Sequence, residues 1–108
     1  MKLYSTAGQS PDVDLQEAIF RGLPPDNGLY MPESIPVLPQ EFIDNLDQKS
    51  IQEIAFAVCK NLLGNDLTDA EISSIISKSI TFEAPIVELE TGTEVLELFH
   101  GPSMAFKD

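Results

Sequence analysis

The stretch LFHGPSMAFKD, residues 98–108, organises this chain. Apolar residues in a strand-like pattern run into the polar corner HGPS, residues 100–103, and MAFKD follows. Lys107 is the candidate nucleophile, because an apolar pocket disfavours the ammonium form and leaves an amine that can react with a carbonyl group. The residue pattern by itself leaves open that Lys107 is an ordinary solvated lysine near the end of the chain.

Composition indicates one small domain. The chain has 108 residues, 43% of them hydrophobic and 7% aromatic, which allows a single modest and mainly aliphatic core. The net charge of -12 opposes binding to nucleic acid or to an anionic membrane. We see neither a membrane span nor a secretory signal, and the single cysteine, Cys59, favours a reducing compartment. We therefore expect a cytoplasmic protein.

The first third of the chain is predicted to contain a short strand, a helix and a turn. The strand covers residues 2–5, and Asp14 can cap a helix over residues 15–21 that ends at Gly22. The turn is PPDNG, residues 24–28, in which two fixed φ angles precede an Asn-Gly pair. The helical spacing predicts that Leu15, Ala18 and Ile19 make one stripe on this helix.

The middle of the chain is predicted to be helical. A short helix follows Pro39, and two longer helices each begin with a capping box. The boxes pair Ser50 with Glu53 and Thr68 with Glu71. The turn at residues 64–66 would join the two longer helices as an antiparallel helical hairpin. Apolar residues recur at helical spacing in both, and the second helix has the stripe Ile72, Ile75 and Ile76.

The last third of the chain is predicted to be a β-hairpin. Apolar and polar residues alternate over 86–90 and 93–99, and Thr91-Gly92 forms the loop between them. The second strand leads directly to His100. The sequence thus predicts an α+β fold with short strands, a helical hairpin and a C-terminal β-hairpin.

Three segments together resemble a known family. LELFHGPSMAFKD (residues 96–108), MKLY (1–4) and GLYMPE (28–33) are similar to parts of threonine synthases, pyridoxal-phosphate enzymes of the tryptophan synthase β-like group. Those enzymes are several times longer. The resemblance implies that residues 1–108 are a truncated N-terminal domain of an enzyme of pyridoxal-phosphate fold type II, most of whose catalytic domain is missing here.

The resemblance also implies roles for individual residues. Lys107 would hold pyridoxal 5'-phosphate covalently and move protons while O-phospho-L-homoserine and water become L-threonine and phosphate. Ser103 occupies a position where threonine is common in the family, and both side chains carry a hydroxyl group. Residues expected to bind substrate or line the cleft are His100, Ser103, Asn27, Gly28 and Tyr30.

Other features limit what this chain can do alone. It has no Gly-rich phosphate loop and no Arg or Lys between Lys78 and Lys107, so we expect it to be inactive by itself. His100 is the only histidine, which gives a metal cluster or a Ser-His-Asp triad almost no support. Two alternatives remain: a non-catalytic acidic interaction module, and another fold type II enzyme such as a threonine dehydratase or cysteine synthase. The sequence leaves the oligomeric state open.

Overall fold

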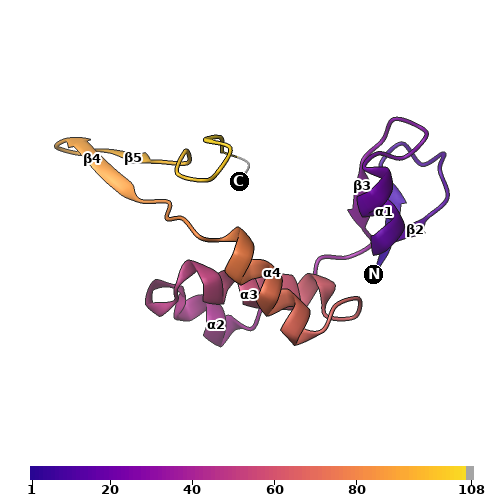
Figure 1. The fold of residues 1–108 in the computed structure, drawn as a ribbon, viewed down its shortest axis with the longest axis horizontal. Helices are drawn as coiled ribbons and strands as arrows, with labels where there is room; N and C mark the ends of the chain where they lie inside the picture. Colours follow the sequence, from indigo (N-terminus) through magenta and orange to yellow (C-terminus); the bar gives the residue numbers. More distant parts are fainter. Residues whose placement is uncertain (107–108) are drawn as a thin grey trace.

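Three groups of elements lie along the molecule: an N-terminal sheet with one helix, a central group of helices, and a C-terminal hairpin (Figure 1). The computed structural model describes residues 1–106. The molecule measures 51 × 29 × 26 Å. Its radius of gyration is 16.9 Å, whereas a compact domain of this length would have about 13 Å. The described chain is therefore elongated, and its core is divided.

The N-terminal sheet has the strand order β2-β1-β3, with both pairs antiparallel. The strands are β1 (Lys2–Ser5), β2 (Val13–Asp14) and β3 (Tyr30–Pro32). The first strand is confirmed, and the two-residue strand β2 was not predicted. The buried cluster of this part consists of Leu3, Val13 and Ala18.

Helix α1 (Leu15–Arg21) has the predicted ends. The side chain of Asp14 accepts a hydrogen bond of 2.8 Å from the backbone N–H of Glu17, and Gly22 ends the helix with a φ of 76°. The stripe predicted on this helix is only partly buried. Ala18 is buried, but Ile19 is 68% exposed.

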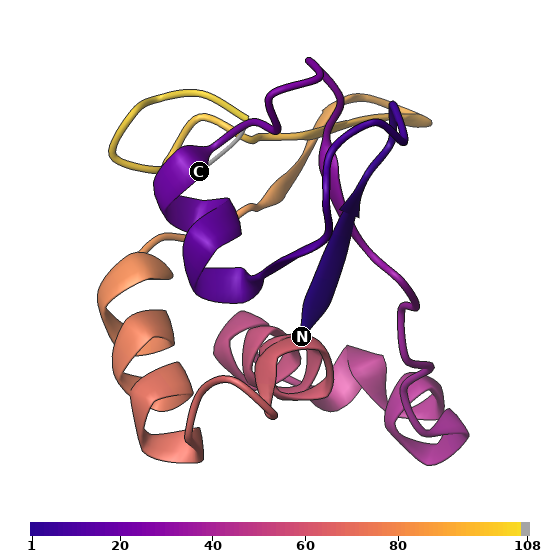
Figure 2. The ribbon, with the colours of Figure 1, turned by 90° about the vertical axis from the view of Figure 1, so that its right-hand side faces the viewer.

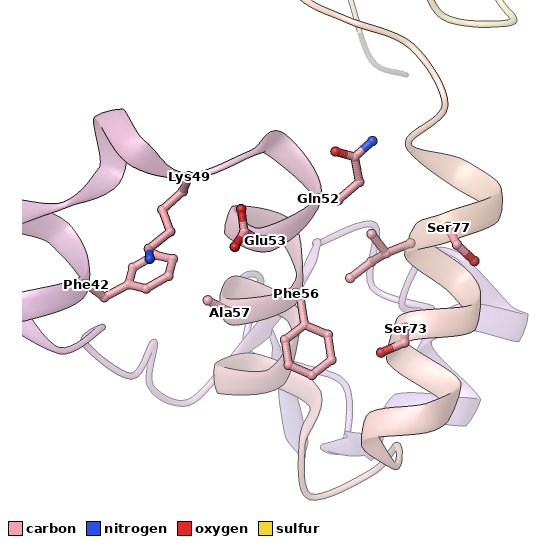
Figure 3. Close-up of a pocket in the computed structure, with 9 residues that line it drawn as sticks. Phe42, Lys49, Gln52, Glu53, Phe56, Ala57, Ser73 and Ser77 are labelled. Carbon is pink, nitrogen blue, oxygen red and sulfur yellow. The ribbon is translucent and has the colours of Figure 1, made fainter.

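The central helices are α2 (Gln40–Asp44), the 3-10 helix η1 (Leu46–Gln48), α3 (Ile51–Leu63) and α4 (Asp69–Ser79). Both predicted capping boxes are present, and their hydrogen bonds lower the pKa of Glu53 and of Glu71. Figure 3 shows the chain running down α3 and back up α4, which confirms a helical hairpin. Within residues 1–106, no helix is both long enough and apolar enough to cross a membrane.

The second isoleucine stripe needed correction. Ile72 and Ile76 are 1% and 5% exposed, but Ile75 is 51% exposed. Ile75 and Ile19 line the same hollow between α1 and α4. The prediction that Ile75 is buried was wrong, and Ile19 is exposed for the same reason: helical spacing places a side chain on a face, but no described residue fills the space that this face meets.

The C-terminal hairpin pairs β4 (Ile86–Glu90) with β5 (Thr93–Leu96), and Gly92 in its loop has a φ of 83°. The second strand was predicted to reach Phe99, but it ends at Leu96. The last pair of the ladder is Ile86 with Leu96. Beyond it the Glu97 N–H still donates to the Pro85 carbonyl, but Pro85 has no N–H to return a bond and continue the ladder. All residues of both strands are exposed, since the hairpin extends away from the helices (Figure 1).

One carboxylate holds the loop between α1 and β3 in place. Asp26 accepts hydrogen bonds from the Ser5 hydroxyl (2.6 Å), from the Gly28 backbone N–H (3.1 Å) and from the Gln9 backbone N–H (3.0 Å). The backbone N–H of Asp26 donates in turn to the Ser10 hydroxyl at 3.3 Å. Donors around the charged form, the Ser5 hydroxyl above all, hold the pKa of Asp26 far below its usual range.

The same loop depends on a close approach at Gly28. A Cβ atom there would lie 2.2 Å from the Ser5 Oγ and 2.8 Å from the Ala7 backbone nitrogen. Asn27, just before it, has a φ of 62°, a conformation that asparagine tolerates better than most residues. Only glycine fits the close approach at position 28. Asn27 supplies the backbone conformation with positive φ that turns the chain just before it.

The corrected helix stripe can be tested with two matched substitutions. Ile72→Ala should lower the free energy of unfolding by about 2–4 kcal/mol, because it empties a buried site. Ile75→Ala, on the same helix, should change it by less than about 0.5 kcal/mol. Urea denaturation of the 108-residue chain followed by circular dichroism gives both values. Equal effects at the two positions would contradict the burial described here.

The Asp26 network predicts a dependence of stability on pH. The pKa of Asp26 is depressed in the folded chain, so its contribution is present above the unfolded value of about 3.9 and is lost as pH falls below it. Asp26→Asn should therefore lose stability at pH 6 and show a smaller further loss between pH 5 and pH 2 than the wild type. Unfolding curves at both ends of that range test this. Asp47→Asn, on the surface of η1, is the control and should keep the wild-type slope.

Candidate functional site

The predicted site residues fall into two groups. His100 and Ser103 lie in the corner after β5, whereas Asn27, Gly28 and Tyr30 lie in the loop before β3 or at its first residue. Figure 2 shows both segments on the same side of the central helices, and Figure 1 shows them apart along the long axis. The described chain does not bring the two groups into one pocket.

The loop group has mixed orientations. The Tyr30 side chain packs against the buried cluster Leu3, Val13 and Ala18, so its ring belongs to the N-terminal core. Its hydroxyl is buried and has no hydrogen-bond partner within residues 1–106. Gly28 is buried and Asn27 is exposed. Asn27 is therefore the member of this group that a ligand could reach directly. That Asn27, Gly28 and Tyr30 line a cleft stays a prediction.

The corner group is built around a histidine. The Nε2 atom of His100 lies 2.6 Å from Oε2 of Glu97, and the ring stacks on Phe99 with centroids 4.7 Å apart. The backbone N–H of Glu97 donates to the carbonyl of Pro85 at 2.9 Å. The hairpin thus fixes Glu97, and Glu97 together with Phe99 fixes the ring of His100.

A tight turn follows the histidine. The backbone N–H of Met104 donates to the carbonyl of Gly101 at 3.0 Å, with Pro102 at the second turn position, where its fixed φ is favourable. Met104 has a φ of 55°, which is uncommon for a residue with a side chain. Ser103 is exposed on this turn. The predicted catalytic residue, Lys107, lies outside the described residues.

A small cavity of about 200 Å³ lies beside the corner. Its walls are mainly apolar and come from the start of α3, from the segment after α4 and from the corner itself. Glu83, Glu97 and His100 contribute polar groups to it. The apolar members are Ile51, Phe82, Ala84, Leu98, Ala105 and Phe106.

The side chains at the corner suit only one part of a pyridoxal-phosphate site. An imidazole, a serine hydroxyl and an apolar wall could contact the ring or the substrate. Residues 79–106 contain no Arg or Lys that could pair with the phosphate. The start of α3 contributes Ile51 to the cavity, but the backbone N–H groups of Ser50 and Glu53 there are already engaged in the capping box. If the chain binds the cofactor, the phosphate must be held by other residues.

A wider hollow of about 450 Å³ lies between α2, α3 and α4 (Figure 3). Its walls include Phe42 and Phe56, and the ammonium of Lys49 lies 6.0 Å from the centre of the Phe42 ring. Glu53 also lines it, but that carboxylate is engaged by Ser50 in the helix cap. No predicted site residue lines this hollow, and we assign no chemistry to it.

Metal binding has no geometric basis in the described part of the chain. Within residues 1–106, no three side chains of His, Cys, Asp or Glu come together as ligands.

Two residues at these sites were missed at the level of sequence. Glu97 stands three residues before His100, a spacing that allows contact in a tight bend, and this could have been noticed. Asp26 lies in the predicted turn, where Asp commonly binds the backbone two residues on, as it does with Gly28. Its bonds to Ser5 and Gln9 join residues 21 and 17 positions apart and have no local signal.

Comparisons with known proteins agree with one another. The family model for the threonine synthase N terminus matches residues 2–80. Threonine synthase of Schizosaccharomyces pombe is 39% identical over 96% of this chain, and that of Pseudomonas aeruginosa is 34% identical over all of it. A mouse protein named threonine synthase-like 2 is 34% identical over 96% of the chain.

A solved structure extends this likeness to three dimensions. The crystal structure of threonine synthase from Escherichia coli matches 99% of this chain with a TM-score of 0.86 and 27% identity. The chain spans only 21% to 25% of the length of these similar proteins. The mixed fold of short strands and helices, and the family match over most of its length, show that this chain belongs to the threonine synthase N-terminal family.

Proposed function

We propose that this chain is the N-terminal part of an enzyme that converts O-phospho-L-homoserine and water to L-threonine and phosphate. The observation that carries the proposal is the structural likeness to the E. coli threonine synthase over 99% of the chain, which includes the corner that leads to Lys107. The reaction class is that of a carbon–oxygen lyase acting on phosphates. We also propose that the whole enzyme is cytoplasmic and has pyridoxal-phosphate fold type II.

Each residue of the corner has a distinct task in the proposed enzyme. Pyridoxal phosphate, bound covalently to Lys107, would supply the electron sink. The amine of Lys107 would then hold and deliver protons at the carbons of the substrate, since a flexible lysine can reach several atoms in turn. His100 and Ser103 would order the substrate beside it. The apolar cavity walls would keep water away from the reacting atoms.

One relative gives a reason to test other amino-acid substrates. The relative named threonine synthase-like 2 is as similar to this chain as the P. aeruginosa enzyme, at 34% identity. Its name does not state the same activity. Substrate profiling of the protein that carries this chain separates the two candidates: turnover of O-phosphohomoserine supports our proposal, whereas exclusive turnover of threonine, serine or O-acetylserine would refute it.

Lys107 can be tested in the full-length protein. Lys107→Ala should reduce phosphate release from O-phosphohomoserine by about 10²–10⁴-fold or more, because the proton-transferring amine is lost. Borohydride reduction followed by peptide mass spectrometry should find the cofactor on Lys107 in the wild type and on no peptide of the variant. Lys78→Ala, in the last turn of α4, is the control and should retain activity and label. Labelling at another lysine in the wild type would overturn this assignment.

The isolated chain should be inactive. Residues 1–108 with added pyridoxal phosphate should release no phosphate above the rate without protein, because residues 79–106 hold no basic side chain for a phosphate group. A phosphate-release assay at high protein concentration measures this. Turnover by the purified chain would contradict this expectation and would show that residues 1–108 are sufficient to bind the phosphate groups.

A further inference from the structure

We propose that Glu97 is a positioning residue for His100, and that it leaves Nδ1 of the ring as the nitrogen that meets the substrate. This inference rests on the proposed function for its catalytic consequence. The pairing itself can be tested without any activity.

The geometry fixes the ring from two sides. Oε2 of Glu97 lies 2.6 Å from Nε2 of His100, and the Phe99 ring stacks on the imidazole at an interplanar angle of 28°. Glu97 is itself anchored through its backbone N–H to the carbonyl of Pro85. A hydrogen bond and a ring stack together restrict both the tilt and the rotation of the imidazole.

The chemistry of the pair then selects one tautomer. An ionised carboxylate can only accept, so the hydrogen of a neutral imidazole must lie on Nε2. Nδ1 keeps its lone pair and can accept a hydrogen bond from an ammonium or hydroxyl group. An amino-acid substrate arrives with a free ammonium group, so a ring that presents an acceptor nitrogen suits the arriving substrate.

Stability of the fold does not account for this pair. The side chains of Glu97 and His100 are 24% and 39% exposed, and a pair at the surface stabilises a fold by roughly 0–1 kcal/mol. The hairpin before it is already closed by backbone bonds. The exposed ring is also accessible to a ligand, and it lines the small cavity beside the corner.

The tautomer can be measured directly, because the chain has a single histidine. Two-bond ¹H–¹⁵N correlation spectra of the 108-residue chain, above the pH at which the ring is protonated, should show the Nε2–H form. Glu97→Ala should shift the population toward the Nδ1–H form, and Glu97→Gln, which keeps an acceptor oxygen, should shift it less. Glu94→Ala on β5 is the matched control and should match the wild type. Identical ring spectra for Glu97→Ala and wild type would overturn the proposal.

Kinetics of the full-length protein test the catalytic consequence. Glu97→Ala should lower kcat/KM for phosphate release about 10-fold, the low end of the loss that follows when the partner orienting a metal-ligating histidine is removed. In a His100→Ala background the same substitution should add little, because its effect passes through the ring. Additive losses would refute a positioning role. If wild-type protein releases no phosphate, the proposed function fails, while the spectra still decide whether Glu97 fixes the ring.

Discussion

The small amount of apolar surface that this chain buries constrains the rest of its structure. Within residues 1–106, the buried hydrophobic residues are Leu3, Val13 and Ala18 in one group and Ile72 and Ile76 in another. The two groups belong to different parts of the molecule. The parts are linked by polar contacts, such as the ion pair of the N-terminal amino group with Asp66 and the bond from Asn61 to the Pro36 carbonyl. Local interactions must therefore supply much of the order that a larger core would give.

Carboxylates carry out much of this local ordering. Asp14, Glu53 and Glu71 satisfy the first backbone N–H groups of three helices or their caps. Asp26 accepts the hydrogen bonds that hold the loop between α1 and β3 in place, and Glu97 holds the imidazole ring of His100. The high acidic content of the chain is thus partly structural, because several acidic side chains accept hydrogen bonds from backbone N–H groups.

Sequence reasoning succeeded where the cause was local. The helix caps at Ser50, Thr68 and Asp14, and the hairpin loop at Gly92, depend on residues within a few positions, and all were found in advance. Burial depends instead on what lies opposite a helix face. Ile19 and Ile75 have the right spacing for a core, but no described residue covers them. The corner at His100 was located from its sequence, whereas the contacts of Asp26 with distant residues could not be. The role of Lys107 stays a prediction.

The exposed hairpin has a consequence for how this chain behaves in solution. Its strands present Ile86, Leu89 and Leu96 to water, together with unpaired strand edges, which is the pattern that promotes strand-to-strand self-association. Acidic residues interrupt that pattern, and Glu88 lies directly opposite Glu94 across the ladder. Like charges so placed oppose both the hairpin and its stacking against a second copy. Added salt screens the repulsion within the hairpin and the repulsion between copies. Salt that stabilises the hairpin therefore also weakens its protection against aggregation.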